Sequence, residues 1–134
     1  MAGKLQLSVV TPERTVVEAE VDSVQLPGEL GYLGILPGHA PLITLLKPGV
    51  ISWSPGGGEG AAAISGGFAE VAEDRVTVLA DTAEKTAEVD VASAEKDRSQ
   101  ASEQLRTANA EEVVDAARNR VEVAEARLSV AKRG

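Results

Sequence analysis

Residues 33–46 read Leu-Gly-Ile-Leu-Pro-Gly-His-Ala-Pro-Leu-Ile-Thr-Leu-Leu. Two short apolar runs flank a Pro-Gly pair, which predicts a strand, a turn that carries His39, and a second strand over residues 42–46. Residues 4–9 alternate polar and apolar side chains, as in a strand with one buried face. Many such short runs separated by turns indicate an antiparallel β-sandwich or flattened barrel. Further strands are predicted over residues 17–26, with a bend near Asp22, and over residues 50–54, 61–65, 68–72 and 76–79.

The chain changes character at Asp90, beyond which it contains no proline and, before the last residue, no glycine. One helix is predicted to begin near Asp90, and the chain to turn near residues 107–109, with Asn109 as the N-cap of a second helix. We therefore expect a β-sandwich over residues 1–88 and an antiparallel two-helix hairpin over residues 89–134. The second helix shows apolar residues alternately four and three positions apart: Ala110, Val114, Ala117, Val121, Ala124, Leu128 and Ala131.

The helical hairpin is rich in alanine along this seam. Alanine buries little apolar area, so two such helices are marginally stable by themselves. We expect the hairpin to rest on another surface and to be able to leave it.

The composition narrows the possible functions. The 134 residues carry a formal charge of −8, no cysteine and one histidine, His39. Nucleic acids and anionic lipids are poor partners for such a chain, because both are bound through clustered cations. One histidine without an orienting group makes neither a catalytic triad nor a two-histidine metal site, so we expect no enzyme and no metal. No apolar run approaches the roughly 20 residues that span a bilayer, so membrane contact is expected only through other proteins.

Two stretches resemble the signatures of a known family. Residues 34–42, followed by Leu-Lys-Pro-Gly at 46–49, are similar to the first signature of the epsilon subunit of F-type ATP synthases. Residues 65–71, Ser-Gly-Gly-Phe-Ala-Glu-Val, and residues 76–84 resemble the second. The resemblance covers essentially the whole chain. It implies a sandwich of about ten strands followed by two antiparallel helices.

The resemblance also implies a function. In that family the sandwich binds the gamma subunit and rests on the ring of c subunits, so that the protein is a non-catalytic rotor part that couples proton translocation to ATP synthesis. The hairpin either lies folded on the sandwich or extends along gamma to the catalytic alpha and beta subunits, where it inhibits ATP hydrolysis. The expected location is peripheral, on the cytoplasmic face of the bacterial plasma membrane rather than on the stromal side of a thylakoid.

The family's contact with the c ring suggests interface residues in the loop predicted over residues 27–32. An acidic residue often stands where this chain has Tyr32, and Glu29 lies nearby. Tyrosine is itself common at interfaces, so Glu29 and Tyr32 are predicted to touch the c ring. His39 and Pro41, inside the first signature, are predicted to face a partner subunit.

The second helix carries cations for a different interface. When the hairpin extends, Arg118, Arg120 and Arg127 are expected to pair with acidic surfaces of the alpha and beta subunits. The helix dipole alone also accounts for the placement of these charges toward the C-terminal side.

Some bacterial members of the family bind ATP at the folded hairpin, through an Ile/Leu-Asp-x-x-Arg-Ala motif, a preceding Glu and later arginines. Residues 89–94 here keep Asp90 but have Ser93 in place of the motif arginine. Without that guanidinium a phosphate loses its fork-shaped partner, so we expect weak or absent ATP binding and no cofactor. The remaining candidates for such a site are Glu84, Asp90, Arg98, Arg118 and Arg127.

Other interpretations of the sequence stay open. Residues 55–60, Pro-Gly-Gly-Gly-Glu-Gly, lack the lysine and the following helix of a phosphate-binding loop, so a hairpin loop is expected. A generic β-sandwich adaptor with a partner-binding hairpin would share every periodicity described above, and only the two signatures argue against it. A nucleotide-sensing module would need more basic residues around Asp90.

Overall fold

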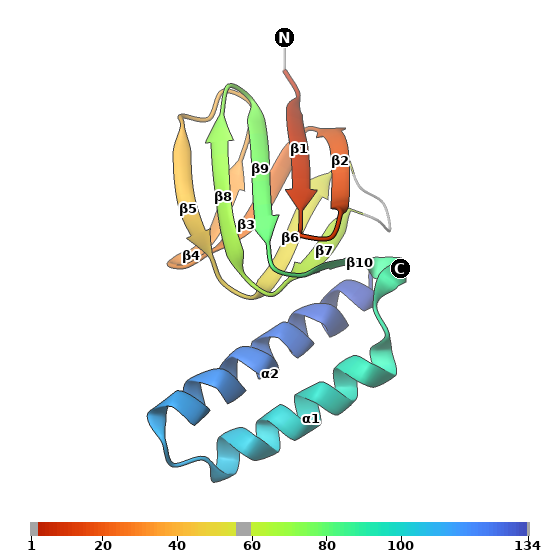
Figure 1. Ribbon diagram of the computed structural model, residues 1–134. Coiled ribbons are helices and arrows are strands. Elements are labelled where there is room, and N and C mark those ends of the chain that lie inside the picture. The colour runs from red at the N-terminus through yellow and green to blue at the C-terminus, as the bar shows by residue number, and fades with distance from the viewer. Residues whose placement is uncertain (1–2, 56–59, 134) are drawn as a thin grey trace.

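The computed structural model describes residues 3–55 and 60–133, and the loop predicted over residues 55–60 lies mostly outside them. Within these ranges ten strands precede two α-helices, which confirms the predicted fold class (Figure 1). The strands are β1 (Leu5–Val10), β2 (Thr15–Val21), β3 (Ser23–Gly28), β4 (Gly31–Ile35), β5 (Leu42–Leu46), β6 (Gly49–Ser54), β7 (Ala61–Ile64), β8 (Gly67–Ala72), β9 (Arg75–Ala80) and β10 (Ala83–Lys85). A short 3-10 helix, η2 (Thr86–Glu88), leads to α1 (Val91–Thr107) and α2 (Glu111–Ala131).

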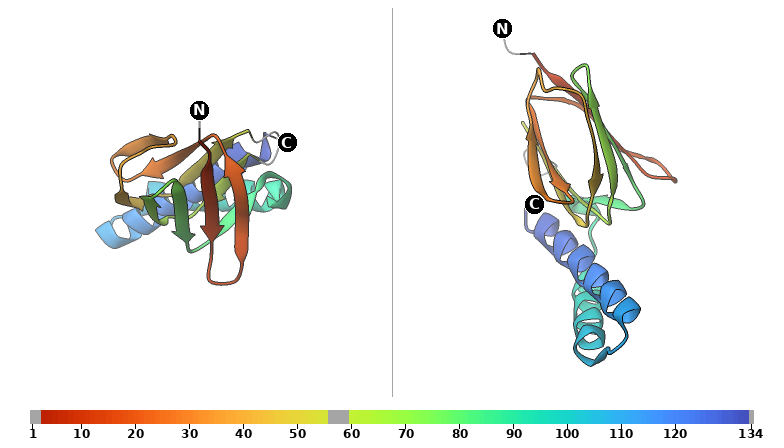
Figure 2. Two further views of the ribbon diagram at one scale, coloured as in Figure 1. Left: turned by 90° about the horizontal axis from the view of Figure 1, so that it is seen from above. Right: turned by 90° about the vertical axis from the view of Figure 1, so that its left-hand side faces the viewer.

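The strands form a sheet that folds over on itself into two layers (Figure 2). Its order is β10-β7-β6-β3-β5-β8-β9-β1-β2, and β4 pairs with β3 off this path. β1 and β9 run parallel, in a sheet that is otherwise antiparallel among the described residues. The edge strands β2 and β10 approach each other, and Arg14, the residue before β2, donates to the Ala83 carbonyl oxygen of β10 at 3.3 Å. Because an open edge can pair with another chain, this contact helps to close the sandwich.

β4 and β5 flank the Pro37-Gly38 turn as predicted, but they differ in their main partners, and β5 meets β3, the partner of β4, only at the Gly28–Leu46 pair. β4 pairs with β3 and β5 pairs with β8, so the turn carries the chain from one layer to the other. The Gly38 amide donates to the Asp74 carboxylate at 2.8 Å, which ties this turn to the one between β8 and β9. The predicted bend at Asp22 is confirmed, because β2 and β3 lie on either side of it and take different neighbours.

The sandwich core consists of aliphatic side chains from both layers. The inward residues of β1 are fully buried, as the alternation predicts, and its outward residues are not. β7 differs, because all four of its residues are buried. Ile64 packs in the sandwich core, whereas Ala61 and Ala63 belong to a second cluster that includes residues of α2. A strand buried on both faces needs cover on its outer side, and α2 supplies it.

The helix starts agree with the sequence in one case and differ in the other. Asp90 is the N-cap of α1, and its carboxylate accepts a hydrogen bond from the Ser93 amide at 3.0 Å. The predicted Asn109 cap is wrong, because α2 starts one residue later and Ala110 occupies the N-cap position. Two glutamates in the first turn of α2 favour this start, since carboxylates interact well with the positive end of the helix dipole.

α2 has two buried faces. Ala117 and Ala124 are buried in the predicted seam, along the side that packs on α1. Ala126 and Val130, four residues apart, form the second face and pack on β7. The expectation that the hairpin rests on another surface is therefore confirmed. In the part of the chain that the structure describes, no helix has both the length and the apolarity that crossing a bilayer requires.

Candidate functional site at the junction of helices and sandwich

The hairpin rests on the sandwich through a small apolar cluster. The cluster consists of Ala61, Ala63, Ala126 and Val130, with Val50 and Val89 packed at its margin. Burial contributes about 25 cal/mol per Å² of apolar surface, and alanine side chains offer little of it. The polar contacts around this small cluster therefore matter for how firmly the hairpin is held.

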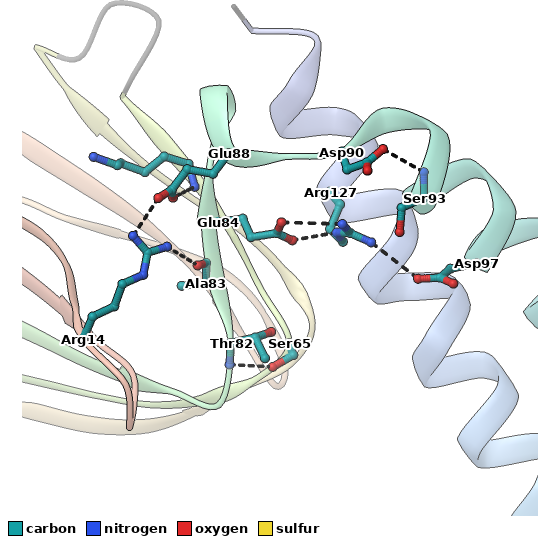
Figure 3. Close-up of polar contacts among 11 residues, drawn as sticks. Arg14, Ser65, Thr82, Ala83, Glu84, Glu88, Asp90, Ser93, Asp97 and Arg127 are labelled. Atoms are coloured by element: carbon teal, nitrogen blue, oxygen red, sulfur yellow. Dashed lines mark hydrogen bonds and ion pairs between the residues drawn. The ribbon is translucent and has the colours of Figure 1, made fainter.

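Arg127 of α2 is the central polar residue of this junction (Figure 3). Its Nε donates to Glu84 Oε1 at 2.6 Å, and its Nη1 donates to Asp97 Oδ2 at 3.4 Å. Glu84 lies on β10 and Asp97 on α1, so one guanidinium joins the sandwich to both helices. The Arg127 side chain is 15% exposed, which limits the screening of the pair by water.

The segment between β10 and α1 is held by a second ion pair. Arg14 Nη1 donates to Glu88 Oε2 at 2.6 Å, and Glu88 Oε1 accepts a hydrogen bond from the Lys85 amide at 2.8 Å. The hydrogen bond from Arg14 lowers the pKa of Glu88 below its ordinary range, and partial burial opposes this effect. Thr86 Oγ1 donates to the Val130 carbonyl oxygen at 3.0 Å, near the end of α2. The segment is thus attached to the sandwich and to the hairpin.

Two of the predicted ATP-site residues come together, but they are paired with each other. They are Glu84 and Arg127, and the guanidinium also faces the Asp97 carboxylate. Arg98 is exposed on α1, and Arg118 lies 3.6 Å from the carboxylate three residues before it on α2. Asp90, the fifth candidate, caps α1 as described above. Phosphates are bound by uncompensated cations and amide donors, and in this structure the Arg127 guanidinium is already faced by two carboxylates.

Tyr32 lies in a strand rather than in the loop predicted over residues 27–32. β3 ends at Gly28 and β4 begins at Gly31, so that expectation is wrong and the turn is limited to Glu29 and Leu30. The Tyr32 hydroxyl accepts a hydrogen bond from the Val50 amide at 3.1 Å. Tyr32 also lines a groove between the sandwich and α2, although its side chain remains largely exposed. Leu30, which the sequence reasoning missed, is fully exposed at the tip of the turn.

The remaining predicted interface residues lie apart from the junction. His39 and Pro41 are in the connection between β4 and β5, and this connection lies at the end of the sandwich away from the helices (Figure 1). The His39 ring is half-buried, and its Nδ1 lies 2.7 Å from the Ala40 carbonyl oxygen. Arg120 Nη1 donates to Gln104 Oε1 at 3.1 Å and so links the two helices.

An apolar patch, which the sequence reasoning missed, lies on the outer face of β5, β8 and β9. It consists of Ile43, Leu45, Phe68 and Leu79, which are 71%, 61%, 42% and 39% exposed. Leu45 is paired with Phe68, and Phe68 with Leu79, so these three side chains form a row across neighbouring strands. The sequence of β5 could have indicated this patch, because apolar residues occupy both faces of that strand. Exposed apolar residues gathered in this way mark an interaction surface.

Known proteins are similar to this chain in architecture and in sequence. The family described as "ATP synthase, Delta/Epsilon chain, beta-sandwich domain" matches residues 4–86, the span from β1 to the beginning of η2. An ATP synthase epsilon chain of Herpetosiphon aurantiacus is 45% identical over 128 residues, which cover 96% of this chain and 94% of that protein. The chain belongs to the ATP synthase epsilon chain family.

The likeness to the epsilon chain family includes the helical hairpin. An ATP synthase epsilon chain of Anaeromyxobacter sp. is 45% identical over 130 residues, which cover 96% of this chain and 98% of that one. Among solved structures, one chain of the Euglena gracilis mitochondrial ATP synthase, described as OSCP/F1/c-ring in rotational state 1, has a TM-score of 0.79. It is 23% identical, and the match covers 98% of this chain and 83% of that chain. At that identity the match shows that the two chains share a fold.

Proposed function

We propose that this chain is the epsilon subunit of the F1 central stalk. In this role it is a non-catalytic rotor part that couples proton translocation to ATP synthesis, held at the cytoplasmic face of a bacterial plasma membrane through the other subunits. Membership of the family supports the place in ATP synthase. The apolar patch carries the proposal further, because a rotor part must hold another rotor subunit firmly, and a row of exposed apolar side chains is suited to a lasting contact.

We assign the apolar patch to the gamma subunit. α2 packs on β6 and β7, whereas the patch lies on β5, β8 and β9 and is open to a partner. Ile43 is paired with Glu70 in the neighbouring strand, so a carboxylate borders the apolar side chains. The complementary surface on gamma would have an apolar centre and a basic margin.

The tip between β3 and β4 is the proposed contact with the c ring. Glu29 and Leu30 form this tip, and the fully exposed Leu30 is suited to a shallow apolar contact beside a charge. Tyr32 lies next to the tip, but its hydroxyl is already used by the Val50 amide. We expect Glu29→Ala combined with Tyr32→Ala to weaken assembly with the c ring. Rotor assembly at the level of the unsubstituted protein would refute this contact.

The helical hairpin is proposed to regulate ATP hydrolysis. Folded on the sandwich, it keeps Arg127 in contact with carboxylates of its own chain. Extended, it would present Arg118, Arg120 and Arg127 to acidic surfaces of the alpha and beta subunits and inhibit hydrolysis. We propose that ATP binds weakly or not at all, since Ser93 replaces the motif arginine and carboxylates of the chain already face the Arg127 guanidinium.

The gamma contact is tested with two leucines that are equally exposed. Leu45 lies in the apolar patch and Leu36 lies in the turn between β4 and β5, and each is 61% exposed. Leu45→Glu should abolish co-purification with gamma because it places a charge in the apolar centre of the contact, whereas Leu36→Glu should leave it intact. Equal retention of gamma by both variants would show that the patch is not the gamma surface.

The regulatory role is tested in the assembled enzyme. Ending the chain after Glu88 removes α1 and α2 but keeps every strand that the structure describes. ATP hydrolysis should rise while gamma still co-purifies, because the apolar patch is unaffected. Unchanged hydrolysis in an intact assembly would exclude inhibition by the hairpin of this chain.

A further inference from the structure

We propose that Glu84, Asp97 and Arg127 form an ionic latch that holds the hairpin on the sandwich without nucleotide. The inference rests on the proposed regulatory role of the hairpin, and it gives that role a physical control. Glu84 belongs to the sandwich, whereas Arg127 and Asp97 belong to the hairpin. The pair between Glu84 and Arg127 therefore exists when the hairpin is docked and is broken when it leaves.

The latch matters because the apolar part of the junction is small. Its buried members are three alanines and Val130, and apolar area sets the strength of such contacts. Arg127 is 15% exposed and Glu84 is 29% exposed, so their pair lies between a surface pair and a buried one. A pair in this environment contributes more than an exposed pair does. It can decide whether a weakly packed hairpin stays docked.

Asp97 makes the latch reversible. Opening separates Arg127 from Glu84, but Asp97 sits on α1 and travels with α2 as part of the hairpin. Arg127 thus keeps one carboxylate partner after release, and the hairpin avoids an uncompensated guanidinium against its own apolar seam. Glu84, which is more exposed than Arg127, gains water instead.

The pivot of this motion is restricted to Val89 and Asp90. The preceding segment is attached to the sandwich by the ion pair of Arg14 with Glu88, and α1 follows directly. Val89 and Asp90 are extended, with φ and ψ of −77° and 126° and of −86° and 103°. Two extended residues between two fixed elements can change their dihedrals without breaking a helix.

The latch also explains how a folded hairpin can persist without the arginine that Ser93 replaces. Here the cation that faces the sandwich is neutralised by carboxylates of the chain itself. The docked state should respond to ionic strength and be indifferent to ATP.

The test measures the docked fraction of the full chain in solution. The chain has no cysteine, so spin labels can be placed at Glu20→Cys on β2 and Ser102→Cys on α1, both exposed positions. Distances between the labels, measured by double electron–electron resonance, then separate docked from open hairpins. Glu84→Gln should raise the ratio of open to docked molecules by about five- to tenfold, as expected for loss of a half-buried ion pair.

Matched variants isolate the latch. Asp115→Asn removes the exposed carboxylate beside Arg118 and should leave the ratio unchanged. Asp97→Asn should change it less than Glu84→Gln, because both Asp97 and Arg127 move with the hairpin. Circular dichroism at each step verifies that the sandwich remains folded.

A salt titration needs no change at the junction itself. Raising NaCl from about 0.05 to 1 M, over which the Debye length falls several-fold, should increase the open fraction of the chain with Glu84 and have little effect with Glu84→Gln. ATP at about 5 mM should leave the open fraction unchanged both in the chain with Glu84 and in Glu84→Gln. The latch would be refuted if the open fraction changed with neither salt nor Glu84→Gln, or if it fell on addition of ATP. Failure of the regulatory role itself would appear separately, as unchanged hydrolysis after removal of the hairpin.

Discussion

Gly67 provides a direct test of how β8 and β9 fit together. A Cβ atom placed on Gly67 would lie 2.0 Å from the Leu79 carbonyl oxygen, and the residue has a φ of +149°. Observed contacts of Cβ atoms stay above 3.0 Å, so an alanine would force β8 and β9 apart by about 1 Å at this point. The backbones of β8 and β9 thus approach each other closely at Gly67.

The cost of Gly67→Ala has two parts. The positive φ costs about 1–2 kcal/mol for a residue with a side chain, and the forced overlap costs about 1–3 kcal/mol more. We expect a loss of about 3 kcal/mol in the free energy of unfolding. Gly38→Ala should cost only the first part, about 1 kcal/mol, because Gly38 has a φ of +87° and open space around it. Gly34→Ala, also in open space, should change stability by less than about 1 kcal/mol.

Urea unfolding measures all three variants on one scale. Trp53 is the only tryptophan in the sequence and packs against the sandwich core, so its fluorescence reports loss of the sandwich, with circular dichroism as a second probe. The three midpoints should order as Gly34→Ala, then Gly38→Ala, then Gly67→Ala, from most to least stable. Equal losses for Gly67→Ala and Gly38→Ala would refute the steric part of the reasoning.

Three further predictions concern the junction and the helices. The pKa of Glu88 is lowered in the folded chain, so its ion pair stabilises the fold at neutral pH and this stabilisation is lost as pH falls through the lowered pKa. In urea titrations, the difference in stability from Glu88→Gln should therefore shrink as pH falls below the ordinary glutamate pKa of about 4.3. Val130→Ala should cost about 1–2.5 kcal/mol in the same assay because Val130 is fully buried, and Val113→Ala, at an exposed position, should cost much less. Asp90→Ala should lower the helical signal and stability by about 1 kcal/mol through loss of the cap, whereas Asn109→Ala should be neutral, and a larger effect at Asn109 would mean that α2 starts there.

Much of the fold could be predicted from local patterns in the sequence. The alternation in β1, the Pro37-Gly38 turn and the cap at Asp90 each depend on residues close together in the chain, and the sequence reveals such patterns directly. The position of the turn between the two helices was predicted from a local pattern as well. β10 was missed because three residues, Ala83–Lys85, are too few to show a period.

Contacts between distant residues were much harder to predict. The pairing of Arg127 with Glu84 joins positions 43 apart in the chain, and nothing local distinguishes Arg127 from the exposed Arg118. The second buried face of α2 was missed for a related reason, since Ala126 and Val130 acquire their partner from β7 only in the folded chain. Asn109 failed as a cap because a one-residue shift in the start of α2 lies within the usual uncertainty of helix ends.

The parallel pairing of β1 with β9 has a consequence for the order in which the protein folds. β1 sits between β2 and β9 in the sheet, and β9 ends only at Ala80. During synthesis the first two strands can pair with each other early, but the second edge of β1, which pairs with β9 in the finished molecule, stays open until β9 has been made, and Leu5 and Leu7 on this strand are apolar. Pairing over such a sequence separation is slow to form, and an exposed apolar hairpin is open to misassembly in the interval. A nascent chain is therefore expected to stay prone to aggregation until β9 has paired with β1.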